Sequence, residues 1–310
     1  MSARSFQFLL GVLIGCNTSP ATATTVLIPS SADTTLIETQ ATNNLGGATI
    51  VNAGTTQTFT RNRGLFRFDV ASQIPRGARI NSVDFVVEVT GEPRDGFTPS
   101  SFGLHRLFKP WGEGNKISAD ATHPGLGSPA TVGEATWNSR FALTTNAWSL
   151  PGGAATNDYA ADLSAQAGIY GVGDSPYTFV STAALVADVQ SWVDDPATNH
   201  GWILISRAEE VNFTARRFAS REDPGREPHL VVDYIPPLVV EQAVVNGSLF
   251  ELRFTAEAGK TYSIDFRDSF TLPGTWQQVP TNIPAQSSNT TITFAEPSSR
   301  MQRFYRVRSP

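Results

Sequence analysis

The sequence predicts an all-β protein: a jelly-roll-type antiparallel β-sandwich with one short helix, followed by a second small C-terminal β-sandwich. Apolar and polar residues alternate along residues 65–70 and again along residues 83–90. Alternation with a period of two is typical of a strand with one buried face in an antiparallel sheet. The 25 Gly and 20 Pro residues among 310 are also typical of many short strands joined by turns.

The chain is predicted to hold two domains behind a signal segment of residues 1–23. The first domain spans residues 25–234 and ends in an alternating strand that contains Leu230 and Val232. Residues 235–237, Ile-Pro-Pro, form the linker, because consecutive prolines break strand pairing. Residues 238–310 alternate over several short segments, which indicates a small β-sandwich.

The N-terminal segment has the pattern of an export signal. Arg4 precedes an apolar run, residues 6–14, that is too short to cross a bilayer. Ala21-Thr22-Ala23 is a small-x-small site that would start the mature chain near Thr24. The sequence Leu-Ile-Gly before Cys16 resembles a lipoprotein box, so two outcomes stay open. We expect a secreted, extracellular protein, with lipid anchoring through Cys16 as the alternative.

Composition excludes several classes of protein. Cys16 is the only cysteine, so the mature fold cannot hold an internal disulfide and must be stabilised by a core rich in its 19 Phe and 6 Trp residues. A formal net charge of −5 argues against general binding to nucleic acid. After the signal segment we expect no membrane span, because no other apolar run is long enough.

One amphipathic helix is predicted inside the first domain. Thr182 can cap its start, and Leu185, Val189 and Trp192 then fall on one helical face. Pro196 ends the pattern. Trp192 is therefore interpreted as a core residue and not as a ligand platform.

The order of short motifs along the first domain resembles the DNRLRE domain, found in secreted bacterial and archaeal modules that include disaggregatase-related and alginate-binding types. The motifs are residues 33–36, 43–47, 63–69, 109–114, 135–137, 179–192, 201–202 and 226–230. The resemblance implies a jelly-roll-type β-sandwich with a non-catalytic role, typically attached to proteins that handle polysaccharide. No catalytic domain accompanies these motifs in this sequence.

The second domain resembles the C-terminal β modules of many secreted proteins from planctomycete-like and verrucomicrobial bacteria. The resemblance rests on GKTYSIDFRDSF, Trp276 and the closing RFYRVR. It implies no activity.

Motifs typical of enzymes are absent from the sequence. There is no Gly-x-Ser-x-Gly, no His-Glu-x-x-His and no phosphate loop, and the four His residues are scattered. Carboxylate pairs of the glycosidase kind are defined by space, so Glu113 and Glu134 remain candidates, although loop acids paired with arginine are the favoured interpretation. We expect no enzymatic activity.

The insertion of residues 91–158 is the predicted binding region, because recognition residues concentrate on loops carried by a rigid scaffold. Indole rings can stack on sugar faces, and arginine grips a carboxylate or sulfate through two N–H bonds. The alternative is that the tryptophans are core residues that pin the loops. The predicted ligand-binding residues are Trp111, Trp137, His105, Arg106, Lys109 and Arg140.

Two further patterns predict electrostatic contacts. Arg216 and Arg217 are neighbours on a predicted strand and must face opposite sides, so we expect one of them to pair with Glu222 or Asp223. A structural Ca²⁺ is a candidate cofactor. Asp33 and Asp69 are its candidate carboxylate ligands, and the sequence does not indicate the remaining ligands.

These observations predict a secreted, non-catalytic protein that binds extracellular polysaccharide, with acidic glycans as candidate ligands. A structural or adhesive cell-envelope protein, whose partners are other envelope proteins, is the alternative. An uncharacterised polysaccharide lyase or hydrolase is the further alternative.

Overall fold

A computed structural model describes residues 23–256, 259–269, 275–286, 290–297 and 303–308. Residues 1–22 of the predicted signal segment, with Cys16, lie outside the described residues. The described chain is predominantly β and its sheets are antiparallel, which confirms the all-β sandwich prediction. Among the described residues, no helix has both the length and the apolar character needed to cross a membrane.

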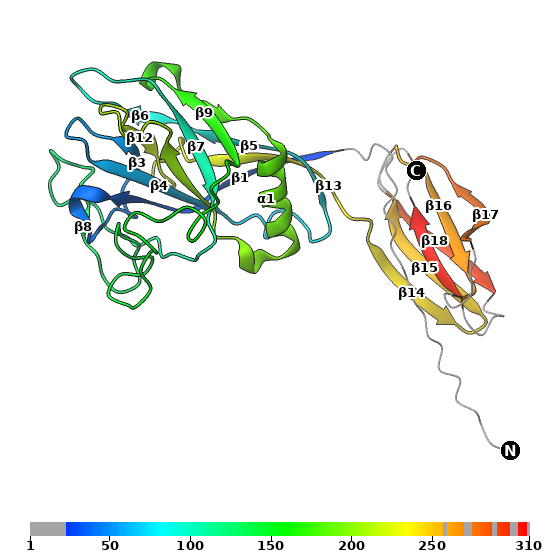
Figure 1. Cartoon of the computed structure of the whole chain (residues 1–310). Coiled ribbons are helices and arrows are strands. Elements are labelled where there is room, and N and C mark those ends of the chain that lie inside the picture. The colour runs from blue at the N-terminus through cyan, green and yellow to red at the C-terminus, as the bar shows by residue number, and fades with distance from the viewer. Residues whose placement is uncertain (1–22, 257–258, 270–274, 287–289, 298–302, 309–310) are drawn as a thin grey trace. The chain divides into compact units, whose positions relative to one another are not determined.

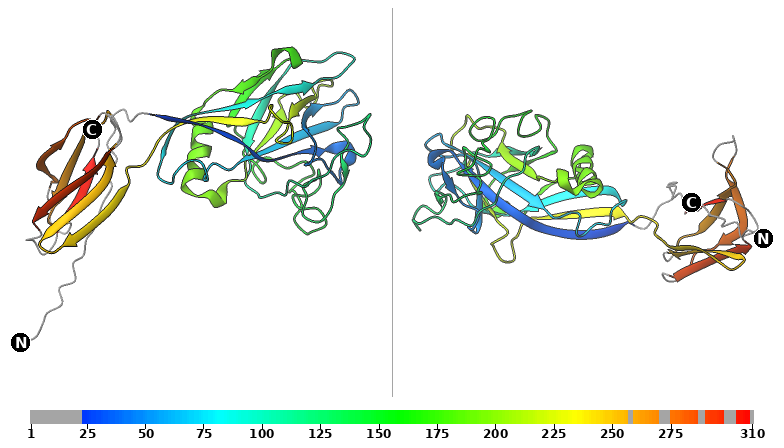
Figure 2. Two further views of the ribbon diagram at one scale, coloured as in Figure 1. Left: turned by 180° about the vertical axis from the view of Figure 1, so that it is seen from behind. Right: turned by 90° about the horizontal axis from the view of Figure 1, so that it is seen from below.

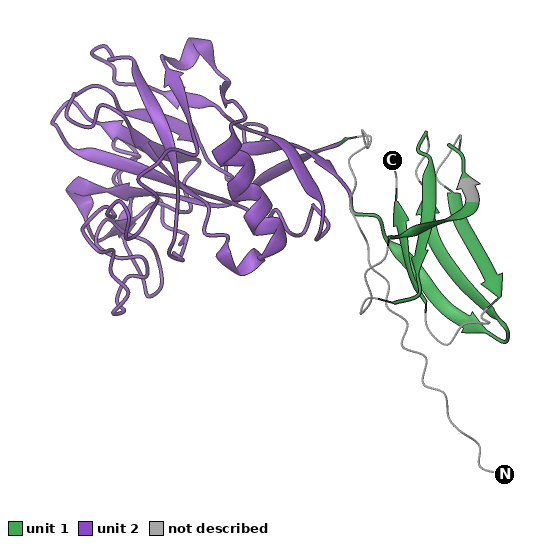
Figure 3. Ribbon diagram, turned by 45° about the vertical axis from the view of Figure 1, so that its right-hand side comes forward, with its two compact units in different colours: residues 1–23, 237–310 green, residues 24–236 purple. Residues whose placement is uncertain are grey.

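The chain divides into two compact units (Figure 3). One comprises Thr24–Pro236, and the other contains Pro237–Pro310. The last strand of the first unit extends to Ile235, so it includes the first residue of the predicted linker.

The first unit contains thirteen strands, one α-helix and three short 3₁₀ helices (Figure 1). The strands are β1 (Thr24–Ile37), β2 (Asn43–Asn44), β3 (Ile50–Thr55), β4 (Arg61–Phe68), β5 (Arg79–Val87), β6 (Val89–Gly91), β7 (Ser100–Arg106), β8 (Ser128–Pro129), β9 (Ala165–Ile169), β10 (Tyr177–Phe179), β11 (Trp202–Ser206), β12 (Arg216–Ala219) and β13 (His229–Ile235). The helices are α1 (Ala183–Asp194) and the 3₁₀ turns Glu38–Gln40, Val172–Asp174 and Pro196–Thr198.

Strand β1 joins the two layers of the first unit. Its first half pairs with β13 and its second half with β4, with an irregularity between Ser30 and Ala32. The strand order is β10-β5-β13-β1-β4-β11-β7-β9, and β12 joins β3 and β6 beside this path. In both views of Figure 2, β1 runs along the unit with β13 beside it. A strand that changes partners in this way lets one chain segment serve both sheets of a sandwich.

The main core lies between these layers. Phe66 and Phe68 of β4 pack with Phe85 of β5 and Trp202 of β11, and all four are fully buried. The predicted alternation is therefore correct for this face. Val89, expected to continue the strand of Val87, begins β6 and pairs with β12 instead.

The opposite face of β4 differs from the prediction, because it is not solvated. Leu65 is fully buried in a second core, formed largely by the part of the insertion that follows β7. This insertion has little regular structure and packs its apolar side chains onto the sheet. Both faces of β4 are therefore covered. The alternation of apolar and polar residues along β4 cannot predict this, because it does not show which distant segment packs on the second face.

Helix α1 matches its prediction closely. The hydroxyl of Thr182 accepts a hydrogen bond from the backbone N–H of Leu185 (3.0 Å). Leu185, Val189 and Trp192 are fully buried, and the helix ends at Asp194 before Pro196. The apolar helix face thus closes one side of the main core.

The second unit is a small sandwich of two three-stranded sheets, ordered β14-β15-β18 and β17-β16-β19. Its core contains Phe250, Leu252 and Phe254, the residues predicted to share one strand face. Its strands are β14 (Val240–Asn246), β15 (Leu249–Ala256), β16 (Tyr262–Arg267), β17 (Gln277–Ile283), β18 (Thr290–Pro297) and β19 (Phe304–Arg308).

Candidate functional site

The structure corrects the expectation that the insertion's tryptophans stack on sugars. Trp111 and Trp137 are only 2% and 5% exposed, and Trp148 is 4% exposed. All three belong to the second core. A ring without an accessible face cannot stack on a ligand, so these residues hold the insertion against the sheet.

Trp111 nevertheless organises the surface above it. Its Nε1 donates to the backbone carbonyl of His200 (2.9 Å), and the guanidinium of Arg67 lies 5.3 Å from its ring centroid. The preceding residue, Pro110, offers its carbonyl to Nη1 of Arg140 (3.0 Å). One buried ring and its neighbour therefore position two arginine side chains and the backbone of His200.

His105 is also internal and is not a ligand contact. It is 7% exposed, and its Nδ1 donates to the backbone carbonyl of Ala160 (2.8 Å). Burial, and after it the positive charge of Arg207, lower the pKa of this histidine. His105 is therefore a neutral residue that connects β7 to Ala160, just after the insertion.

The other predicted cations, Arg106, Lys109 and Arg140, lie near His200, as does Arg67. The sequence did not single out Arg67 or His200 as binding residues. Burial lowers the pKa of His200, and the nearby positive charges of Arg67, Arg106, Arg140 and Lys109 lower it further. We call these five residues the cationic patch. At neutral pH it carries four permanent positive charges, and His200 is uncharged.

Strand pairing explains why the patch forms. Trp202, the first residue of β11, pairs with Phe66 of β4 and with Arg106 of β7. In these antiparallel pairs the ends of β4 and β7 flank the start of β11. Arg67, Arg106 and His200 consequently lie near one another, although they come from three separate parts of the sequence.

The cations of the patch are poorly neutralised. Arg106 forms an ion pair with Asp188 (3.5 Å), and its guanidinium lies 5.9 Å from the Trp192 ring. Within the described part of the chain, Lys109 and the other two arginines of the patch make no ion pair with a carboxylate. Lys109 is exposed.

The arginine pair on β12 is only partly as predicted. Arg216 is buried and Arg217 exposed, so the two side chains do face opposite sides. Neither pairs with the expected acids: Glu222 contacts Arg221, and Asp223 contacts Arg226. The prediction failed because backbone carbonyls, which carry no sequence signal, surround Arg216.

Asp33, one of the two predicted Ca²⁺ ligands, lies in an acidic cluster with Glu113 and Glu222. One oxygen from each carboxylate lies within 4.8 Å of the others. Arg221 donates through Nη2 to Glu113 (3.0 Å) and pairs with Glu222 (2.9 Å). The guanidinium therefore supplies the positive charge that a metal would bring. Asp69 is exposed at the end of β4 and does not belong to this cluster.

Glu113 and Glu134, the candidate catalytic acids, have structural contacts. Glu113 accepts the backbone N–H of Asp33 (2.8 Å) in addition to its bonds with Arg221. Glu134 is 6% exposed, accepts the N–H groups of Thr131 (2.6 Å) and Asn115 (3.3 Å), and lies 3.4 Å from the ammonium of Lys116. These contacts connect the insertion to itself and to β1.

Neither a family model nor a curated protein matches this chain. The resemblance to the DNRLRE domain therefore remains an expectation based on the motifs quoted above.

Proposed function

We propose that the first unit is a non-catalytic binding module for an acidic polysaccharide of the extracellular space, and that the cationic patch is its contact surface. The observation that carries the proposal is the convergence of four permanent cations, three of them without a carboxylate partner in the described structure. The protein as a whole is acidic, so such a concentration of positive charge is a local feature.

The chemistry of the patch suits uronate carboxylates or sulfate esters. A guanidinium can offer two parallel N–H groups to a planar carboxylate, while the ammonium of Lys109 acts as a mobile point charge. Uncharged His200 can add a neutral hydrogen bond. The arginines over Trp111 and Trp192 are held by cation–π contacts, which reduces the entropy lost when a ligand binds.

The proposal is tested by affinity electrophoresis in gels that contain alginate, pectin or a sulfated glycan. We expect retardation that weakens as ionic strength rises, because salt screens exposed charges. Lys109→Ala should weaken binding about tenfold, the equivalent of about 1.4 kcal/mol for one charged contact. Arg67→Gln should act in the same direction.

Arg76→Ala and Arg94→Ala are matched controls, since both residues are exposed arginines outside the patch and each change removes one positive charge. Equal weakening by control and patch variants would show that only net charge matters and would overturn the proposal. The absence of retardation on the whole panel would also overturn it.

A second candidate function, that of a structural or adhesive envelope protein, is favoured by one exposed apolar feature. Val132 and Leu143 are 71% and 76% exposed. Between them, the backbone N–H of Gly133 donates to the carbonyl of Ala142 (3.0 Å), so both side chains belong to one ribbon of the insertion. Capture of an envelope protein that is lost in a Val132→Ser, Leu143→Ser double variant, without glycan binding, would support this function.

A further inference from the structure

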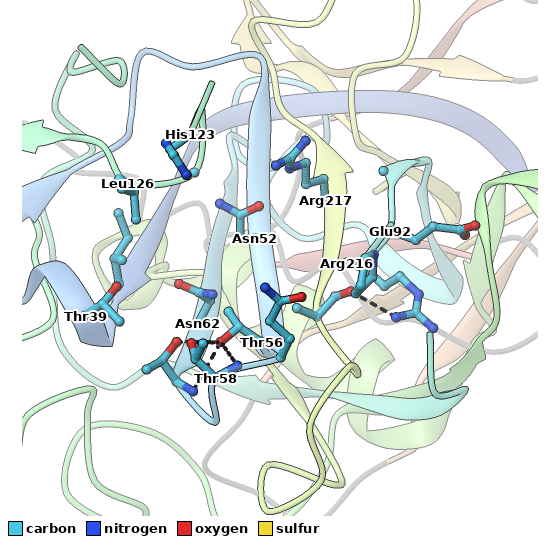
Figure 4. Close-up of a pocket in the computed structure, with 17 residues that line it drawn as sticks. Thr39, Asn52, Thr56, Thr58, Asn62, Glu92, His123, Leu126, Arg216 and Arg217 are labelled. Carbon is cyan, nitrogen blue, oxygen red and sulfur yellow. Dashed lines mark hydrogen bonds between the residues drawn. The ribbon is translucent and has the colours of Figure 1, made fainter. Parts of the chain in front are cut away.

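A cavity of about 350 Å³ lies on the first unit, lined by residues that come from neither the cationic patch nor the second core (Figure 4). Its walls include Asn52 of β3, Asn62 of β4 and Arg217 of β12, with the turn that joins β3 to β4. Arg217 pairs in register with Asn52, which places their side chains on neighbouring strands. The volume falls in the range of small-ligand sites.

Two amide side chains in this cavity lack protein partners. Asn52 and Asn62 are 7% and 8% exposed, and neither amide group hydrogen bonds to any residue that the structure describes. The amide atoms are accessible from the cavity, where water or a ligand can complete their hydrogen bonds. Both are drawn among the residues that line the cavity in Figure 4.

Most charged or titratable residues that line the cavity already form hydrogen bonds with other protein groups. Glu92 accepts the backbone N–H of Val172 (2.9 Å), and Arg216 donates to backbone carbonyls that include that of Tyr170 (2.6 Å). His123 is bound to Asp120 through Nδ1 (2.7 Å). Apart from Arg217, the polar groups that remain available are amides and hydroxyls, and Ile37, Pro93 and Leu126 add apolar surface between them.

The turn between β3 and β4 supplies hydroxyl groups that are already fixed in place. The hydroxyl of Thr56 is hydrogen bonded to those of Thr58 (3.1 Å) and Thr60 (2.6 Å), and all three residues line the cavity. Between them, Phe59 is 64% exposed and has a positive φ of 59°. A bulky residue in this conformation is uncommon, which marks the turn as a strained and specialised one.

We propose that this cavity binds an uncharged sugar residue and recognises it through its hydroxyl groups. An amide side chain donates and accepts hydrogen bonds, and so does each sugar hydroxyl, so Asn52 and Asn62 can each engage adjacent hydroxyls of one ring. Threonine methyl groups contact the C–H face of the ring. Phe59 on the turn supplies an aromatic surface for the next sugar of the chain. The site is independent of the proposed function at the cationic patch.

The test uses the full chain and a panel of neutral oligosaccharides of glucose, galactose, xylose and mannose. Binding is followed by saturation-transfer NMR and titration calorimetry. We expect at least one member to bind with Kd below about 1 mM. Asn52→Leu and Asn62→Leu should each weaken that binding at least tenfold and leave the unfolding temperature unchanged or higher, because they replace an unpartnered amide with an apolar group of similar size.

A variant that fills the cavity tests whether its volume is needed for binding, apart from its amide groups. A Cβ added at Gly125 would lie 3.0 Å from Nδ2 of Asn52, so Gly125→Leu fills the space beside this amide without removing either asparagine. It should abolish neutral sugar binding. Asn246→Leu, at an exposed amide of the second unit, is the matched control and should have no effect.

The two sites can fail separately. Lys109→Ala should not change neutral sugar binding, and Asn52→Leu should not change retardation by acidic glycans. If no neutral oligosaccharide binds, or if binding survives in Asn52→Leu, Asn62→Leu and Gly125→Leu, the proposal for the cavity is overturned. A fall in stability without a change in binding would assign the amides a purely structural role and would overturn it as well.

Discussion

Buried ionisable side chains set the pH response of this protein at the scale of single residues. Asp33 is 1% exposed, and its carboxylate accepts the backbone N–H of Arg221 (2.9 Å) and the hydroxyl of Ser30 (3.1 Å). Burial, opposed by the Arg221 contact and assisted by the negative charges of Glu222 and Glu113, raises the pKa of Asp33 to about 8. Asp33 is therefore mainly protonated at neutral pH, and this reduces repulsion within the acidic cluster.

This shift predicts a specific pH dependence. Because the folded pKa lies above the unfolded value, the folded state binds the proton more tightly. The protonated Asp33 carboxyl therefore stabilises the folded state fully below the ordinary carboxyl pKa, and this stabilisation is lost as pH rises toward 8. Stability should fall across that window by up to about 1.4 kcal/mol per pH unit. In Asp33→Asn, which keeps an acceptor for Arg221, thermal unfolding from acidic to mildly alkaline pH should show a flatter curve. An unchanged curve would contradict the shift.

At the scale of elements, the buried side chain of Arg216 holds the short strand β12 in place through hydrogen bonds. Arg216 is 1% exposed and donates to the backbone carbonyls of Tyr170 (2.6 Å), Ala215 (2.9 Å) and Thr98 (3.1 Å). Its guanidinium also lies 4.5 Å from the ring of Phe97. Burial lowers its pKa, yet an arginine stays charged at any physiological pH. The side chain thus joins β12 to the separate loops that contain Thr98 and Tyr170.

Arg216 and Arg217 form a matched pair for a stability experiment, since both substitutions remove one positive charge from the same strand. Arg216→Leu should cost about 3 kcal/mol, because several buried carbonyls lose their donor. Arg217→Leu should change stability by less than about 0.5 kcal/mol, as expected for an exposed residue without an ion pair in the described structure. Urea titration of the two variants measures the difference, and equal losses would disprove the anchoring role of Arg216.

At the scale of the whole molecule, the chain contains two units with separate cores. The first unit has its own main and second cores, and the second unit packs Phe250 on Tyr305 with ring centroids 4.2 Å apart. Pro236 and Pro237 lie at the division between the units. Separate cores joined by a short proline-containing segment are expected to unfold as separate cooperative units.

A chain shortened to residues 24–236 is therefore expected to fold. Calorimetry of the longer chain should show two transitions, and the shortened chain should keep one of them at an unchanged temperature. It should also retain any binding to acidic glycans that the full chain shows, because all five residues of the cationic patch lie in the first unit. Loss of folding on truncation would mean that the second unit stabilises the first.

Much of the fold could be predicted because it follows from local patterns. Phe66 and Phe68 alternate with charged residues and do face the main core, and Thr182 caps α1 as its spacing predicts. The candidate site was predictable only in part: Arg106, Lys109 and Arg140 all lie near His200, whereas Trp111 and Trp137 are buried beneath the surface. Arg67 and His200 were missed, although Arg67 alternates with Phe66 and Phe68 and so lies off the main-core face of its strand, which was a usable signal.

The sequence by itself determined the β class, the helix, the boundary between the two units and the presence of several basic residues in the insertion. These depend on periodicity and turn residues within short stretches of chain. Only the tertiary structure decided which aromatic rings are covered, which cations meet, and that Asn52 and Asn62 share a cavity. The physical reason is that burial and electrostatic grouping depend on contacts between distant segments, here the strand ends of β4, β7 and β11 and the insertion packed on them.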